Sequence, residues 1–200
     1  SICQPEYLIN QVKEYSNKKD YTSSEGVDEL NLSIKSSFTT NKYKVDKVLF
    51  GNGLKELLYI VQLCFTGKIF HVTPSWLSYK EQINILNKND NLVEVKTTIE
   101  NNYKIDLNLL ENFLKENEKY DKIIIFNNPN NPTGLIHTPE EVEKIALILK
   151  KYNCIVFADE IYMNLNHFNN IETISSFIPE LTIRGSSVSK DLACGGYRLG

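Results

Sequence analysis

The stretch K-I-I-I-F-N-N-P-N-N-P-T-G, residues 122–134, decides the fold of this 200-residue chain. Three consecutive isoleucines followed by a phenylalanine predict a strand over 122–126 that is buried on both faces. The polar segment 127–134 contains two X-Pro units and a closing glycine, which predict a rigid turn at the end of that strand. A strand buried on both faces is typical of a parallel sheet covered by helices.

Short apolar runs alternate with helical patterns on both sides of this strand, from Lys47 onward. Apolar runs separated by helices of about ten to fifteen residues predict βαβ units and therefore an α/β fold with a parallel sheet. The other expected strands are 48–50, 69–72, 92–95, 154–158 and 181–183. The expected helices are 54–65, 75–86, 107–117 and 139–152, the last with Thr138 as its cap.

The first forty residues differ from this pattern. Residues 1–20 are polar with apolar residues at helical spacing, and a second helix is expected over 27–38 with Leu30, Ile34 and Phe38 on one face. We therefore expect an N-terminal helical segment over residues 1–40 and one large domain over residues 41–200. No internal repeat or flexible linker is visible in the sequence.

Composition limits the classes of function. A net charge of −3 and a pI near 5.7 offer nucleic acid no basic face. The sequence has neither an apolar run of about eighteen residues nor a basic-then-apolar leader, so we expect no membrane span and no signal peptide. Four scattered cysteines without a C-x-x-C pattern predict reduced thiols in a cytoplasmic compartment and no metal site. The first residues resemble the interior of a longer protein, which leaves a lost organellar leader open.

Ligands of parallel sheets bind beyond the carboxyl ends of the strands. Five consecutive strand ends in this sequence carry polar, glycine or aromatic residues, and together they predict one site at that edge. The segments are 51–53, 74–76, 127–134, 159–160 and 186–190.

The first two of these segments each allow two interpretations. The turn G-N-G at 51–53 leads directly into a helix, so the free N–H groups of Leu54 and Lys55 suit an anion, although an ordinary βα turn has the same pattern. The dinucleotide pattern G-x-G-x-x-G and the P-loop pattern G-x-x-x-x-G-K-[ST] are both absent. Trp76 is the only tryptophan, and it suits either stacking on a flat heteroaromatic ring or a place in the core.

Asp159 ends an apolar strand, and Tyr162 follows three residues later. A carboxylate in that position is partly desolvated and costs free energy unless a cation, such as a pyridinium N–H, lies opposite. The alternative is that Asp159 caps the next segment. The asparagines of 127–134 offer donors and acceptors, so one of them can bond a phenolic oxygen, whereas a purely structural turn is the other interpretation.

The stretch G-S-S-V-S-K-D-L-A-C-G-G-Y-R-L-G, residues 185–200, contains the candidate nucleophile. A lysine held near other cationic groups, as Lys190 would be, can form a Schiff base with an aldehyde; the alternative is a solvated loop lysine. Only Arg184 and Arg198 among the 22 basic residues are arginine. The planar fork of Arg198, eight residues after Lys190, suits a phosphate.

Taken in order, G-N-G-L-K-E, P-S-W-L-S-Y, N-P-N-N-P-T-G, A-D-E-I-Y and S-x-S-K followed by G-x-R-x-G resemble the class I and II aminotransferases. These are pyridoxal-phosphate enzymes of the aspartate aminotransferase fold, and the resemblance runs from about Tyr21 to Gly200. It implies fold type I of the pyridoxal-phosphate enzymes, with a three-layer α/β/α large domain and a mainly parallel sheet. It also implies a C-terminal small domain whose arginine binds the substrate carboxylate, and we expect that domain to be missing because the chain stops at Gly200.

The resemblance also implies roles for the matching residues. Lys190 would form a Schiff base with pyridoxal phosphate and shuttle a proton, while Asp159 would keep the pyridine nitrogen protonated so that the ring accepts electrons. Tyr21 resembles a tyrosine that reaches the phosphate of the neighbouring subunit, which implies a homodimer with shared active sites. The remaining implied contacts are Asn131 and Tyr162 on the ring 3-oxygen, Trp76 stacked on the ring, and Gly53, Ser187, Arg198 and the N–H groups of Leu54 and Lys55 on the phosphate.

Two residues depart from the family pattern without removing a side-chain contact to the cofactor. Leu54 replaces a small residue, and Leu77 replaces a proline. The resemblance implies an aminotransferase that moves an amino group between an amino acid and a 2-oxo acid. Lyases and decarboxylases on the same fold share these motifs, and a truncated, catalytically inactive chain is a third interpretation.

Overall fold

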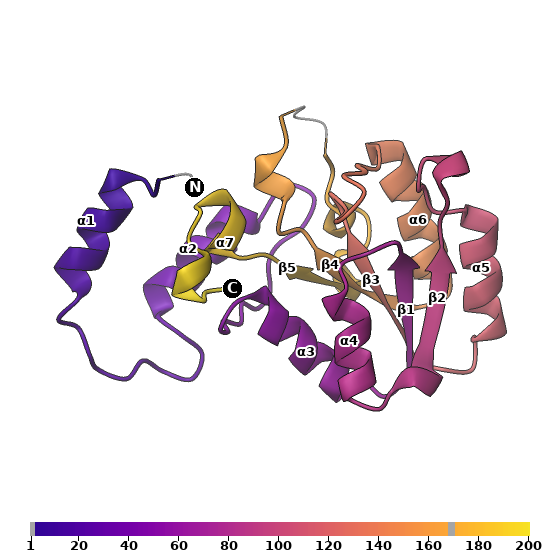
Figure 1. Ribbon diagram of the computed structural model, residues 1–200, viewed down its shortest axis with the longest axis horizontal. Helices are drawn as coiled ribbons and strands as arrows, with labels where there is room; N and C mark the ends of the chain where they lie inside the picture. Colours follow the sequence, from indigo (N-terminus) through magenta and orange to yellow (C-terminus); the bar gives the residue numbers. More distant parts are fainter. Residues whose placement is uncertain (1–2, 168–170) are drawn as a thin grey trace.

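The computed structural model describes residues 3–167 and 171–200, and its centre is a parallel sheet in the order β2-β1-β3-β4-β5 (Figure 1). The expected burial of the central strand on both faces is confirmed, because all six residues of β3 are buried. The strands are β1 (Lys68–Thr73), β2 (Leu92–Lys96), β3 (Lys122–Asn127), β4 (Cys154–Asp159) and β5 (Thr182–Gly185).

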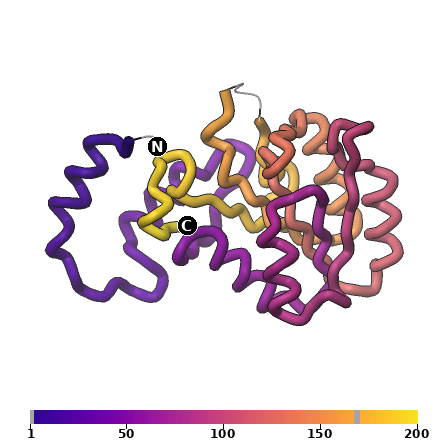
Figure 2. The backbone as a smooth tube through the Cα atoms, viewed as in Figure 1, coloured from indigo at the N-terminus to yellow at the C-terminus, as the bar shows by residue number. Residues whose placement is uncertain are grey.

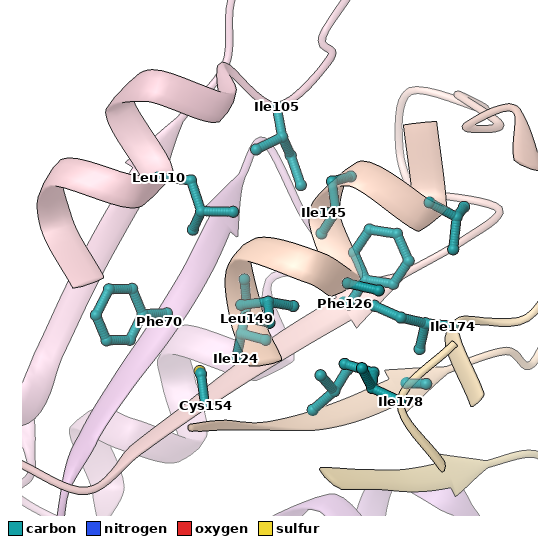
Figure 3. Packing of buried hydrophobic residues seen from close by; sticks show 14 of the residues in the cluster. Phe70, Ile105, Leu110, Ile124, Phe126, Ile145, Leu149, Cys154, Ile174 and Ile178 are labelled. Carbon is teal, nitrogen blue, oxygen red and sulfur yellow. The ribbon is translucent and has the colours of Figure 1, made fainter. Parts of the chain in front are cut away.

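Helices cover both faces of the sheet and produce the three-layer α/β/α arrangement that the family resemblance implies. Helices α3 (Leu54–Cys64) and α4 (Ser78–Ile85) pack on one face, and α5 (Leu107–Glu116) and α6 (Pro139–Lys151) pack on the other. Figure 3 shows the second of these interfaces, where side chains of the helices meet those of β1, β3 and β4. The core residues labelled there include Phe70, Leu110, Ile124, Phe126, Ile145 and Leu149.

Helix α6 shows how the local sequence fixes an element of this layer. Thr138 accepts a hydrogen bond from the Glu141 N–H, and the Glu141 side chain accepts one from the Thr138 N–H, which forms a capping box. Such a cap stabilises a helix by about 1 kcal/mol. Pro139 follows the cap, where its missing N–H costs no hydrogen bond. The predicted cap is therefore confirmed.

The N-terminal helices pack less tightly than the helices on the sheet. Neither α1 (Glu6–Tyr15) nor α2 (Asp28–Phe38) has a buried residue, and α1 stands apart from the sheet in the ribbon and in the backbone trace (Figures 1 and 2). The division between residues 1–40 and 41–200 stays a prediction. One further α-helix, α7, spans Val188–Asp191, and the 3-10 turns are η1 (Asn89–Asn91), η2 (Ile99–Asn101), η3 (Met163–Leu165), η4 (Ile174–Ser176), η5 (Pro179–Leu181) and η6 (Gly195–Tyr197).

Two expected elements differ from the structure. The strand expected over 48–50 was wrong, because this segment lies outside the sheet and the backbone pairing begins only at Gly51, which exchanges two hydrogen bonds of 3.1 Å with Gly200. The helix expected from residue 75 begins at Ser78. Ser75 Oγ lies 2.5 Å from His71 Nε2, and this contact holds the chain in a non-helical turn before the helix starts.

The four cysteines are all free thiols. Cys3 and Cys64 are exposed, whereas Cys154 and Cys194 are buried. Burial raises the pKa of Cys154 to about 12, so this thiol stays protonated at neutral pH. Within residues 3–167 and 171–200, every helix is too short or too polar to cross a bilayer, and no group of His, Cys, Asp and Glu could hold a metal ion.

Candidate functional site

The register of the parallel strands brings the predicted polar residues to one edge. Asn127 at the end of β3 is opposite Asp159 at the end of β4, and Asp159 is opposite Gly185 at the end of β5. The chain leaves β1 in one direction, toward β2, and returns on the other side of β1 to form β3. Crevices for ligands form where the order of the strands reverses in this way. The candidate site therefore lies at the carboxyl edge around β1, β3 and β4.

Asp159 is the buried anion of this site. Its side chain accepts hydrogen bonds from Tyr79 Oη at 2.6 Å and from the Ile161 N–H at 3.2 Å, and the residue is 4% exposed. Burial raises the pKa of Asp159, and the hydrogen bonds from Tyr79 and Ile161 oppose that rise. No ion pair reaches Asp159 within the described part of the chain. The hydrogen-bond partners of the Asp159 carboxylate are therefore neutral donors, whereas the sequence suggested a cation.

Tyr79 connects Asp159 to the aromatic residues of the β1 edge. Its ring makes edge-to-face contacts with Trp76 at 5.6 Å and with His71 at 5.8 Å between ring centroids. Burial and the neighbouring Asp159 carboxylate raise the pKa of Tyr79 well above its ordinary value, so the hydroxyl remains a donor. Sequence reasoning did not identify Tyr79, although it lies three residues after Trp76, a spacing that places two side chains on one side of a helical turn.

The polar turn after β3 brings a second pair of predicted residues together. Asn131 Nδ2 lies 3.2 Å from Tyr162 Oη, to which it donates a hydrogen bond. Asn127 supports the turn, because its Oδ1 accepts from the Asn131 N–H at 2.7 Å and its Nδ2 donates to the Asp159 carbonyl at 2.9 Å. The Lys190 ammonium lies 5.8 Å from the centroid of the Tyr162 ring. The candidate nucleophile therefore lies beside the Asn131–Tyr162 pair.

The start of α3 and the end of the described chain form the other half of the site. Gly53 has a φ of +89° and precedes α3, whose first N–H groups, those of Leu54 and Lys55, have no partner within the helix. A Cβ atom at Gly53 would lie 2.4 Å from Arg198 Nη2, so a side chain there would collide with this guanidinium. Arg198 is exposed and donates hydrogen bonds to the carbonyls of Asn52 and Gly195.

Ser187 is buried just behind this helix start. Its Oγ accepts from the Ser189 N–H at 3.1 Å and lies 2.9 Å from the Leu199 carbonyl. Trp76 is half-buried, with the Lys55 ammonium 5.6 Å from its ring centroid. Tyr21, in contrast, is fully exposed in the connection between α1 and α2 and is not brought to these residues.

The arrangement suits one flat, polar ligand with an anionic end. A buried carboxylate suits a ring N–H⁺, an amide and a phenol suit a ring oxygen, and helix N–H groups with an arginine suit a phosphate. The first two groups lie at or after the ends of β3 and β4, and the third lies at the start of α3 and at Arg198, after η6. The charges and hydrogen-bonding groups present therefore fit a phosphorylated pyridine aldehyde, with Lys190 as the amine.

Comparison with known proteins agrees with this fit. The family model for aminotransferase class I and II matches residues 7–200. The chain belongs to this family. It is 34% identical over 191 residues to an aspartate aminotransferase of Bacillus sp. (strain YM-2), which covers 90% of this chain and 47% of the relative. An asparagine–oxo-acid transaminase of Streptococcus mutans is 32% identical, with coverage of 90% and 47%.

Solved structures of the family share the fold. The crystal structure of an aromatic aminotransferase from Pyrococcus horikoshii OT3 superposes with a TM-score of 0.88 at 25% identity, covering all of this chain and 55% of that chain. The aspartate aminotransferase of Thermotoga maritima gives a TM-score of 0.86. This chain spans about half the length of the curated relatives it matches. The predicted fold class is thereby confirmed.

Proposed function

We propose that this chain forms the pyridoxal-phosphate-binding part of an aminotransferase that exchanges an amino group between an amino acid and a 2-oxo acid. The observation that carries the proposal is the buried Asp159 carboxylate, which has only neutral donors and lies beside the Asn131–Tyr162 pair. A buried anion without a cation is costly, and a protonated ring nitrogen would remove that cost.

The cofactor would lie along the carboxyl edge of the sheet. Asp159 would hold the proton on the ring nitrogen, Asn131 and Tyr162 would bond the ring oxygen, and Trp76 would cover one face of the ring. Arg198 and Ser187 would bind the phosphate with Gly53 and the N–H groups of Leu54 and Lys55. When bound, pyridoxal phosphate supplies an electron sink for the carbanion that forms at the substrate Cα.

Residues of this chain would hold and transfer the protons at the bound cofactor. Lys190 would supply the amine that holds the cofactor aldehyde as an imine, with loss of water, and its free Nζ would accept the proton from the substrate Cα. Tyr79 holds the buried Asp159 carboxylate in place, where it would keep a proton on the ring nitrogen away from water. Trp76, fixed edge-on by Tyr79, would keep the ring from tilting.

The named relatives favour amino-group transfer over the lyase and decarboxylase alternatives, because their names describe aminotransferases and transaminases. Their names include aspartate and asparagine as substrates, so they support the reaction class and not one amino acid. The exposed Tyr21 is consistent with the implied homodimer, in which it would reach the partner's phosphate site. The free thiols favour a reducing compartment such as the cytoplasm.

Borohydride trapping tests the proposal. The chain is incubated with pyridoxal phosphate, reduced and mapped by peptide mass spectrometry, with Lys190→Ala and Lys55→Ala as a matched pair of variants. We expect a visible imine absorbance and an adduct at Lys190 in the wild type and in Lys55→Ala, and neither signal in Lys190→Ala. An adduct at another lysine would overturn the assignment. Half-transamination of an amino-acid panel, with ammonia and carbon dioxide monitored, separates transfer from elimination and decarboxylation.

A further inference from the structure

Arg184 is, besides Arg198, the other arginine of this chain, and the proposed cofactor contacts do not include it. Its guanidinium engages three groups at once. Nε donates to the Glu160 carboxylate, Nη1 donates to Tyr43 Oη at 2.9 Å, and the guanidinium carbon lies 4.5 Å from the centroid of the Phe38 ring. A lysine has one nitrogen and no planar face, so it cannot make these contacts together.

The partner carboxylate is almost completely buried. Glu160 is 3% exposed, and it also accepts a hydrogen bond of 2.5 Å from Thr173 Oγ1. Burying a carboxylate is costly unless a cation and further hydrogen bonds satisfy it, and Glu160 has both. The ion pair between Lys42 and Glu172 differs, because the Lys42 side chain is 48% exposed and such surface pairs contribute little. The Arg184 pair therefore fixes its segments more firmly than a surface pair does.

Arg184 joins three chain segments, each of which leads to a proposed cofactor contact. Arg184 itself lies in β5, three residues before Ser187. Glu160 directly follows Asp159, and its N–H donates to the Gly185 carbonyl at 3.0 Å. Tyr43 lies in the segment that enters the turn at 51–53, and this segment has neither helix nor strand between α2 and α3.

We propose that Arg184 is a positioning residue, which acts through Glu160 and Tyr43 to set the phosphate-binding turn relative to Ser187 and Asp159. The proposal rests on the proposed function insofar as these three places hold the cofactor. The turn itself is held by the backbone pair of Gly51 with Gly200, by the hydrogen bond from Arg198 to the Asn52 carbonyl, and by the Glu56 carboxylate, which accepts from the Asn52 N–H and side chain. Releasing Tyr43 would free the segment that enters the turn, which these contacts do not reach.

The test compares pyridoxal phosphate with pyridoxal, which lacks the phosphate. Arg184→Lys keeps a charge opposite Glu160 but loses the fork, Tyr43→Phe removes one hydroxyl, and Lys42→Gln breaks the neighbouring exposed ion pair as a control. We expect affinity for pyridoxal phosphate to fall about tenfold in Arg184→Lys and about threefold in Tyr43→Phe, where tenfold corresponds to about 1.4 kcal/mol. Affinity for pyridoxal stays unchanged, and Lys42→Gln matches the wild type for both ligands.

Hydrogen exchange provides a readout that needs no ligand. The amides of residues 45–53 should exchange faster in Tyr43→Phe and Arg184→Lys than in the wild type or Lys42→Gln, while the amides of β3 keep their protection. If the wild type prefers pyridoxal phosphate and both variants keep the full preference, the positioning proposal is overturned. If the wild type shows no such preference, the proposed function fails instead, and equal exchange in Tyr43→Phe and wild type overturns the positioning role independently.

Discussion

The ring end and the phosphate end of the proposed cofactor site are built in different ways. At the ring end, Asp159 and Tyr79 are buried and hydrogen-bonded to each other at the edge of a packed sheet. At the phosphate end, Arg198 is exposed and donates hydrogen bonds to backbone carbonyls that a phosphate would replace as its partners. Strand register and core packing fix the first arrangement, whereas the turn at 51–53 and the exposed Arg198 form most of the second. We therefore expect the ring end to govern the rate and the phosphate end to govern cofactor affinity.

Replacing Asp159 gives the largest expected effect and tests the first half of this comparison. Asp159→Ala removes the group that keeps the ring nitrogen protonated, so we expect the half-reaction with an amino acid to slow by about a thousandfold, or about 4 kcal/mol of barrier. Cofactor affinity should change by less than about tenfold, because the phosphate contacts remain. Stopped-flow absorbance measures the rate, and near-normal turnover would mean that the carboxylate is only structural.

Replacing Arg198 should weaken cofactor affinity and leave the half-reaction rate almost unchanged, and this effect should be smaller than that of Asp159→Ala. Arg198→Ala removes charge-assisted hydrogen bonds to the phosphate, which are worth about 2 kcal/mol, so we expect the dissociation constant for pyridoxal phosphate to rise about thirtyfold. The half-reaction rate at saturating cofactor should stay close to that of the wild type. Equilibrium titration followed by single-turnover kinetics separates the two quantities. A variant with unchanged affinity and a lowered rate would reverse the roles assigned to the two ends.

Acid should lower the free energy of unfolding through two buried histidines. Burial lowers the pKa of His71 and of His137 to about 4. Because the unfolded chain binds these protons near pH 6.5 and the folded chain only near pH 4, stability is full above pH 6.5 and falls as the pH drops between these values. The loss amounts to about 3 kcal/mol per histidine at most. Urea unfolding across this range measures it.

A single variant isolates one of the two histidines. Both ring nitrogens of His137 lack a partner among the described residues, and its ring packs against Phe126, so His137→Phe loses no side-chain hydrogen bond. We expect this variant to lose less stability than the wild type between pH 6.5 and pH 4. An identical pH profile in the variant would show that His137 titrates normally in the folded chain.

Removing the Tyr79 hydroxyl should give the smallest effect. Tyr79→Phe keeps the ring contacts with Trp76 and deletes the hydrogen bond to Asp159, which costs about 1 kcal/mol of stability. That bond lowers the pKa of Asp159, so its loss raises this pKa further. We expect the acid limb of the half-reaction to shift to higher pH, with the plateau rate reduced less than about tenfold. An unshifted acid limb would separate Tyr79 from the function of Asp159.

The sequence predicted those parts of the molecule that depend on local patterns. The isoleucine run predicted β3, and the polar residues after each strand predicted the edge at which Asn127 and Asp159 meet. Contacts between distant segments were not predicted. Glu160 directly follows β4 and Arg184 lies in β5, and no local spacing signals a pair that only the sheet brings together.

The same limit explains the strand expected at 48–50. Its residues favour extended backbone, and the segment is not paired in the sheet, because pairing depends on a partner elsewhere in the chain and not on the segment's own propensity. Tyr79 was missed for a related reason. Its hydroxyl matters only because the fold brings it to Asp159, eighty positions along the chain.

Three glycines around the proposed site have a consequence for how this site tolerates genetic change. A Cβ atom would lie 2.4 Å from Arg198 at Gly53, 2.7 Å from Leu54 at Gly185 and 2.6 Å from the Leu54 nitrogen at Gly200. Every single-nucleotide change at the first two positions of a glycine codon introduces a side chain or a stop signal. In a library of random point mutants selected for cofactor binding, amino-acid changes should therefore be rarest at Gly53, whose φ is +89°, and at Gly200, where the neighbouring atoms belong to the backbone, and more frequent at Gly196, where an added Cβ would meet nothing within 4 Å.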